Sequence, residues 1–217
     1  MTVSIGIAVG SGRVESLVAD VLVLPFFESD RPLRGPVARA DWRLCGLLSA
    51  LLRAGRVRGV PGEAVLLPSG GHLRTPLILA VGLGARAGFG AARLRAATSQ
   101  AFQRVAGLGA QTVVFALPTE LGPEVPMERA AESWLEGAVQ AASGLDGALS
   151  CQVLVPERGA AAAGRGLTEA VARHQSGDLA LHWAQPRSAS AGPVRPVSSA
   201  GLRRGISPSR VPRPAPS

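Results

Sequence analysis

The chain has 217 residues, of which 47% are hydrophobic and 18% charged, so it can form one domain with a substantial core. No uninterrupted apolar run approaches the ~18 residues that a membrane span needs. No basic leader precedes the first apolar stretch, so we do not expect a signal peptide. The sequence therefore predicts a cytoplasmic protein without a membrane segment.

The positive charge is unevenly distributed along the chain. The formal net charge is +8 and the isoelectric point is near 11.4, and all 23 basic residues are arginines because lysine is absent. Residues 185–217 hold six of these arginines and no acid, so the preceding residues are nearly neutral. Lysine, asparagine and tyrosine, whose codons are AT-rich, are all missing. A GC-rich genome explains that bias without invoking function.

The first half of the chain alternates apolar, β-branched runs with a helical pattern. Residues 3–9 and 20–27 predict buried strands. One helix is predicted from Pro36, which suits a first helical turn, to a C-cap at Gly55. The side chains expected on its buried face are Trp42, Cys45, Leu48 and Leu52. Residues 62–71 and 75–84 predict two paired strands joined through a Gly-Gly turn.

The second half continues the alternation. Residues 111–118 predict a buried strand, 150–157 a last strand and 164–177 a short helix. An amphipathic helix is predicted over 91–107, with a buried stripe of Leu94, Ala97, Ala101, Phe102 and Val105. Pro126 is expected to open a further helix with an inner face of Met127, Ala130, Ala131, Trp134, Leu135 and Ala138. The acids expected on the solvent side of that helix are Glu128, Glu132 and Glu136.

This order of elements predicts the fold class. Strands that alternate with helices in this way form an α/β fold, with a largely parallel sheet covered by helices on both faces. The pattern fails from about Pro186 onward, where Pro, Ser and Arg dominate and aromatic residues are absent. Such a segment cannot bury enough apolar surface to fold, so we expect a disordered tail over 185–217.

The residue types that usually carry chemistry are scattered. Cys45 and Cys151 lie far apart in sequence and are expected to be buried free thiols. The three histidines have no metal-ligand spacing and are expected to be ordinary: His72, His174 and His182. The glycines form a Gly82-x-Gly84-x-x-x-Gly88 pattern, which differs from the GxGxxG fingerprint and follows at least three strands instead of the first. We therefore expect a turn at these glycines and no dinucleotide site.

Three segments taken together resemble a known family. They are "VLVLPFFESDRPLRG", "LLSALLRAGRVRGVPGEAVLLPSGGHLRTPLILAVGLGARAGFGAARLRAA" and "LGAQTVVFALP". Their order is similar to that of the N-terminal domain of leucine aminopeptidases, from about Val3 to Glu157. The resemblance implies a three-layer α/β/α fold similar to macro domains, with a mixed, largely parallel sheet. It divides the chain into a domain at 1–158, a linker helix at 159–184 and the tail at 185–217.

The resemblance also implies which chemistry to expect. In leucine aminopeptidases a separate C-terminal domain holds two divalent metals through lysine and carboxylate ligands, and a signature like NTDAEGR supplies some of them. Without lysine or asparagine, this chain can contain neither the metal-site lysine nor that signature. We therefore expect no catalytic residue, no metal or cofactor site and no peptidase activity from this chain on its own. The resemblance implies an interaction or oligomerisation module, or a remnant, whose partner is a full-length aminopeptidase paralogue or a second copy.

Three alternatives remain open from the sequence. The chain could be a nucleic-acid-binding regulator that uses the arginine-rich tail, with Arg203 and Arg204 as its adjacent pair of cations. It could be a truncated or frameshifted aminopeptidase, because out-of-frame reading of GC-rich DNA gives a tail of this composition. It could also bind an ADP-ribose-type ligand as macro domains often do, although residues 24–40 lack the asparagine and the glycine cluster of those binders.

Overall fold

The computed structural model describes residues 3–118, 121, 125–145, 147–174 and 179–183. The predicted tail at 185–217, with Arg203 and Arg204, lies outside these residues. Within them, no helix is both long and apolar enough to cross a lipid bilayer.

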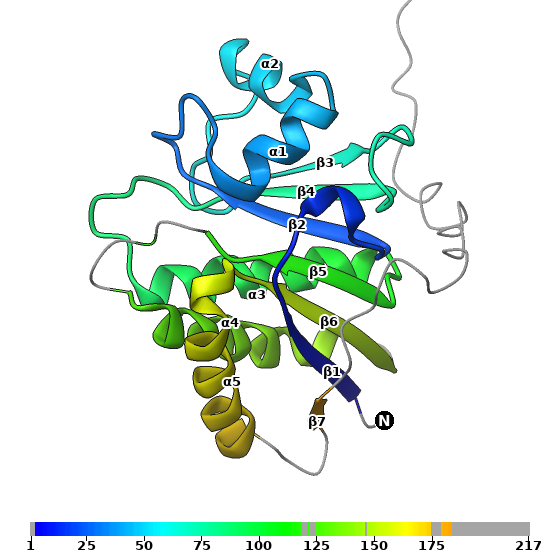
Figure 1. Ribbon diagram of the computed structural model, residues 1–217, viewed down its shortest axis with the longest axis vertical. Helices are drawn as coiled ribbons and strands as arrows, with labels where there is room; N and C mark the ends of the chain where they lie inside the picture. The colour runs from blue at the N-terminus through cyan, green and yellow to red at the C-terminus, as the bar shows by residue number, and fades with distance from the viewer. Residues whose placement is uncertain (1–2, 119–120, 122–124, 146, 175–178, 184–217) are drawn as a thin grey trace, which may run out of the picture.

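A seven-stranded mixed sheet forms the middle of the molecule (Figure 1). Its strand order is β3-β4-β2-β5-β6-β1-β7, and every neighbouring pair is parallel except the antiparallel pair of β3 and β4. The strands are β1 (Val3–Gly10), β2 (Val21–Phe26), β3 (Ala64–Pro68), β4 (Leu77–Gly82), β5 (Thr112–Ala116), β6 (Ala148–Leu154) and β7 (Leu179–Trp183). The predicted mixed, largely parallel sheet is confirmed.

Helices cover the two faces of this sheet unequally. One layer consists of α3 (Ala91–Gly107), α4 (Met127–Ala141) and α5 (Ala160–His174), and the other of the short helices α1 (Gly35–Arg43) and α2 (Leu47–Arg53). Because side chains alternate along a strand, the two faces of β5 feed two separate cores. Val113 and Phe115 belong to the core under α3–α5, and Val114 and Ala116 to the core under α1–α2. The predicted three-layer α/β/α fold is confirmed.

The core under α3–α5 is built around three aromatic rings. Phe102 lies parallel to Phe115 at 6.3 Å between ring centroids, and Trp134 meets both rings edge-on. Two glycines let the helices approach one another closely. A Cβ on Gly137 would collide with the carbonyl oxygen of Arg95 in α3, and one on Gly166 with a backbone carbonyl of α4.

The helix predicted between Pro36 and Gly55 is in fact two helices. The chain turns at Cys45 and Gly46, which have φ values of 55° and 77°, and α2 begins at the next residue. Asp41 holds this turn, because its buried carboxylate accepts hydrogen bonds from the backbone N–H groups of Leu48 (2.7 Å) and Ser49 (3.2 Å). Because of this break, the residues on either side of the turn do not share the single helical face that the sequence predicts. Trp42 and Cys45, both expected on the buried face, are therefore exposed.

Two further predictions are wrong. Glu132 does not face solvent, because α4 lies between α3 and α5; it is buried and pairs with Arg129 at 2.6 Å and with Arg173 at 3.5 Å. The strand near residue 150 is not the last one either. Helix α5 packs on α4, and β7 then adds to the outer side of β1, so the segment predicted as a linker helix contributes a helix and an edge strand to the domain.

Candidate functional site

The candidate site lies at the carboxyl edge of the sheet, where β2, β5, β6 and β1 all end. In open α/β sheets ligands usually bind at this edge. Here β2 leads through Phe27 into a turn at Asp30, and the N-terminus of α1 follows at Gly35 and Pro36. Gly35 has a φ of 63°, a left-handed conformation that suits glycine and aims the helix start at the ends of the strands. Two neighbouring hollows at this edge share Pro36 and Leu117.

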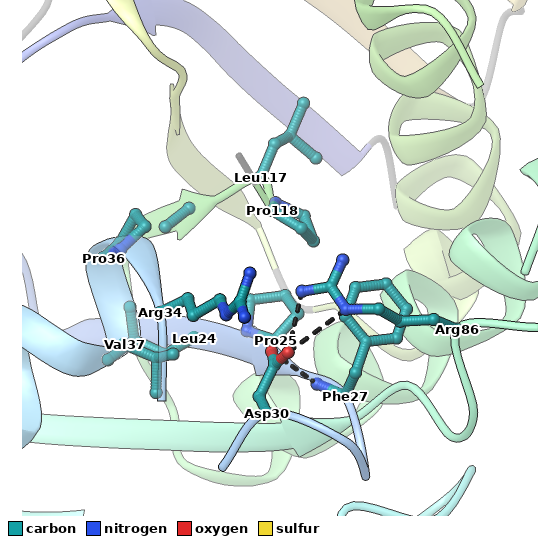
Figure 2. Close-up of a pocket in the computed structure, with 11 residues that line it drawn as sticks. Leu24, Pro25, Phe27, Asp30, Arg34, Pro36, Val37, Arg86, Leu117 and Pro118 are labelled. Atoms are coloured by element: carbon teal, nitrogen blue, oxygen red, sulfur yellow. Dashed lines mark hydrogen bonds and ion pairs between the residues drawn. The ribbon is translucent and has the colours of Figure 1, made fainter. Parts of the chain in front are cut away.

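An ion pair occupies the first hollow (Figure 2). The Asp30 side chain is buried, and its Oδ2 accepts a hydrogen bond of 3.1 Å from the backbone N–H of Phe27. Its Oδ1 accepts two more from Arg86, one from Nε at 3.2 Å and one from Nη2 at 2.7 Å. The guanidinium of Arg86 lies 4.2 Å above the Phe27 ring, so a cation–π contact fixes the arginine from its other side. Figure 2 shows the Arg34 side chain extending toward the same carboxylate.

This arrangement closes the first hollow to substrates. The remaining volume is about 20 Å³, which is room for about one water molecule. Each carboxylate oxygen of Asp30 already accepts a hydrogen bond, and the negative charge of Asp30 faces the guanidinium of Arg86. A carboxylate held in this way stabilises the turn after β2 and is poorly placed to take a proton from a ligand.

The second hollow is larger and has a positive rim. Its volume is about 280 Å³, and it lies where β1, β6 and β5 end beside the start of α1. The charged side chains that line it are Arg13 and Arg39. The Nη2 atom of Arg13 lies 3.5 Å from the Oε1 atom of Glu15. The hollow therefore offers two guanidinium groups and a helix N-terminus, which together suit an anionic ligand.

Glu15 moderates the positive charge near this rim. Burial alone raises the pKa of Glu15. A hydrogen bond from its own backbone, a hydrogen bond from Arg13 and the charges of Arg13 and Arg39 lower it, and together they outweigh the effect of burial. The net result is a pKa below the ordinary value of 4.5. Glu15 is therefore ionised at neutral pH and offsets one of the two arginine charges.

The glycines after β4 make a turn, as predicted. Gly84 has a φ of 79°, and its N–H donates a 2.8 Å hydrogen bond to the carbonyl of Gly59. A Cβ on Gly82 would collide with the carbonyl oxygen of Val60. These glycines let the loop at 59–61 pack against the end of β4, and α3 begins only at Ala91.

The scattered cysteines and histidines stay apart in the fold. Cys151 is buried as predicted, and burial raises its pKa well above its ordinary value, whereas Cys45 is exposed. His182 lies near Ser4, with 3.4 Å between its Nδ1 and the hydroxyl oxygen. Among the described residues, no three His, Cys, Asp or Glu side chains gather in a way that could hold a metal ion.

Sequence reasoning did not single out the residues of this edge. Asp30, Arg86, Arg13 and Arg39 lie in separate segments, and no short motif joins them. The sequence signal for them is weak: the segment "ESDRPLRGP" directly follows a buried strand, and its charged residues are therefore placed at the carboxyl edge. The predicted nucleic-acid residues, Arg203 and Arg204, lie outside the described residues.

Comparison with known proteins identifies both a sequence family and a fold. Residues 23–150 match the model of the cytosol aminopeptidase family, N-terminal domain. No curated protein sequence matches the chain.

Three solved structures illustrate the fold. A tomato leucine aminopeptidase mutant has 20% identity and a TM-score of 0.60, and the match covers 78% of this chain but only 36% of that one. An Oceanobacillus iheyensis macrodomain mutant has 14% identity and a TM-score of 0.60, over 76% of this chain and 88% of that one. The O. iheyensis macrodomain with ADP has 16% identity and a TM-score of 0.55, over 76% of this chain and 91% of that one. These likenesses establish a macrodomain-like fold, and the chain spans about a third of the tomato enzyme's length.

Proposed function

The chain belongs to the cytosol aminopeptidase family, and on that basis we propose that it acts as a non-catalytic interaction module whose partner is a full-length aminopeptidase or a second copy. The matched region is the N-terminal domain of that family. The observation that carries the proposal is the Asp30–Arg86 pair. It fills the hollow at the carboxyl edge where an α/β enzyme would keep a reactive group accessible.

The β7 edge of the sheet supports association with another protein. β7 is the last strand in the sheet order of the described residues and pairs with β1. Trp183, at its carboxyl end, is 49% exposed. Tryptophan is enriched among the residues that dominate binding energy at interfaces. We therefore assign the protein contact to the exposed Trp183 at the end of β7.

Sedimentation velocity tests this assignment. The full chain is centrifuged alone at increasing concentration, and then with a purified full-length aminopeptidase of the family. A larger species is expected in one of the two series, and Trp183→Ala should weaken it by at least ~10-fold, as a truncated interface tryptophan usually does. Trp42→Ala, which alters an exposed tryptophan in α1, is the matched control and should leave the species unchanged. A monomer throughout both series would contradict the proposal.

A second function is favoured by the Arg13–Arg39 hollow. Its two guanidinium groups, the start of α1 and a volume of about 280 Å³ suit a ligand with phosphate groups, of the ADP-ribose type. The O. iheyensis macrodomain solved with ADP is similar to this chain in fold. The hollow belongs to the same edge of the sheet as the Asp30–Arg86 pair but is not blocked by it.

Calorimetric titration with ADP-ribose and with ADP tests this second function. We expect heat of binding from the full chain and a loss of about 10-fold or more in affinity on Arg39→Gln, because a charge-assisted hydrogen bond contributes roughly 1.5–3 kcal/mol. Arg165→Gln, an exposed arginine on α5, is the control. Binding that survives Arg39→Gln unchanged would remove the hollow as the site.

A further inference from the structure

The outer side of the α1–α2 hairpin carries an exposed aromatic ring among arginines. Trp42 is 73% exposed, the most exposed of the large apolar side chains in the described residues. The Arg43 guanidinium lies 5.5 Å from the centroid of its ring. Arg39 precedes Arg43 by one helical turn. We call these three side chains, Arg39, Trp42 and Arg43, the hairpin surface.

The segment that contains the hairpin surface is strongly basic. Residues 31–58 contain seven arginines, and all seven side chains are exposed. The only acid in this segment is Asp41, which is buried and accepts hydrogen bonds from backbone N–H groups at the start of α2. The nearest acids on either side are also committed, since Asp30 pairs with Arg86 and Glu63 accepts hydrogen bonds from two backbone N–H groups. Residues 31–58 therefore present cations with no exposed acid among them, and Glu15, near Arg39 and Arg13, offsets only part of this charge.

These features select an anionic partner that also has flat apolar faces. A second copy of this surface is excluded, because it would bring like charges together. Tryptophan stacks well with nucleic-acid bases, and arginine pairs with phosphates, so a protruding ring beside several arginines matches a single strand with unstacked bases. An acidic protein surface could satisfy the arginines, but it would not explain a ring that protrudes and carries a cation over its face.

We propose that the hairpin surface binds single-stranded nucleic acid, with a base stacked on Trp42 and the flanking phosphates paired with Arg39 and Arg43. Binding of this kind tolerates different sequences and weakens as salt rises, because the arginines release counterions from the backbone. The residues proposed here differ from the tail arginines Arg203 and Arg204, none of them belongs to β7, and Arg39 also lines the second hollow.

Fluorescence anisotropy of a labelled oligothymidylate, titrated with the full chain at several salt concentrations, tests the proposal. Trp42→Ala should weaken binding by about 5- to 150-fold, which corresponds to the roughly 1–3 kcal/mol of one stacked base. The double variant Arg39→Gln/Arg43→Gln should weaken binding and also reduce the slope of log K against log salt, by about 0.7 for each phosphate that the variant leaves unpaired. Trp183→Ala and Arg165→Gln are the matched controls and should bind like the unmodified chain.

The same titration separates the hairpin from the tail and from a protein ligand. Binding that persists in Trp42→Ala and is abolished in Arg203→Gln/Arg204→Gln would assign the site to the tail and overturn the proposal. Equal affinity for a polyglutamate probe, abolished in Trp42→Ala, would assign the surface to acidic polypeptides and overturn it as well. The absence of any binding at low salt would also overturn the proposal. Because Trp42 is exposed, circular dichroism should show that its variant folds normally.

Discussion

The two helical layers of this domain use the same residue types in opposite ways. In the α3–α5 layer Trp134 is fully buried, and arginines pair with glutamates between helices, as in Arg95–Glu136 and Arg165–Glu128. In the α1–α2 layer Trp42 is exposed, and the arginines outnumber the acids seven to one over residues 31–58. The first layer is organised to stabilise the sheet. The second packs its inner side on the sheet, and among the described residues its outer side exposes Trp42 and arginines.

The largest expected effect distinguishes the two tryptophans. Trp134→Ala would leave a large cavity beside Phe102 and Phe115 and should lower the free energy of unfolding by about 3–5 kcal/mol. Trp42→Ala removes a side chain that packs on little else and should change it by less than about 0.5 kcal/mol. Urea unfolding of both variants measures the difference. A similar loss in both would mean that Trp42 packs in solution, and the contrast between the layers would fail.

Two glycines of α5 test how closely the α3–α5 layer is packed. Gly166→Ala places a Cβ against the carbonyl oxygen of Glu128 in α4 and should cost about 1–3 kcal/mol of stability. Gly164→Ala, two residues earlier, meets nothing within 4 Å and should stabilise the helix by about 0.5–1 kcal/mol. Thermal unfolding should therefore move in opposite directions for the two variants. Stabilisation by Gly166→Ala as well would show that α4 and α5 are farther apart than this geometry requires.

How much could be predicted from sequence also differs between the layers. The sequence predicts the α3 helix with its bounds of 91–107 and its buried stripe, because a long apolar pattern of one period leaves little choice. It does not predict the α1–α2 break, which depends on Asp41, whose carboxylate reaches across the turn to the N–H groups of Leu48 and Ser49. An apolar pattern that continues through such a turn looks like one helix.

The carboxyl-edge site is less predictable than the fold. Asp30 and Arg86 are 56 residues apart, and they meet only because β2 and β4 are neighbours in the sheet. The solvent-facing prediction for Glu132 is wrong because helical periodicity does not indicate a third helix, α5, packed over α4. The family resemblance indicates the order of the strands, whereas pairs made by tertiary contact leave no pattern in one sequence.

The turn at Asp41 provides a prediction for the α1–α2 layer. Asp41→Ala removes the acceptor for the N–H groups of Leu48 and Ser49 and should cost about 1–2 kcal/mol, measured by urea unfolding. Asp41→Asn keeps one acceptor oxygen and should cost less. If the hairpin surface binds oligothymidylate, Asp41→Ala should also weaken that binding, because Asp41 ties the end of the helix that carries Trp42 and Arg43 to the start of α2. Unchanged stability would show that the turn does not depend on this carboxylate.

The smallest expected effect concerns Glu15, which lies beside Arg13 and Arg39 at the edge of the basic layer. Its folded-state pKa lies below the ordinary value of 4.5, so the ionised form stabilises the fold at neutral pH. That contribution should be present at pH values above about 4.5 and should disappear as the pH falls through the lower, folded-state pKa. Glu15→Gln should therefore be less stable than the unmodified chain near neutral pH, by at most about 1 kcal/mol. The difference should vanish in acid. Urea unfolding of both proteins across this pH range measures it. A difference that persists unchanged in acid would mean that Glu15 stabilises the fold by packing and not through its charge. The charges of Arg13 and Arg39 would then not be neutralised by Glu15 and would remain available to an anionic ligand at the carboxyl edge.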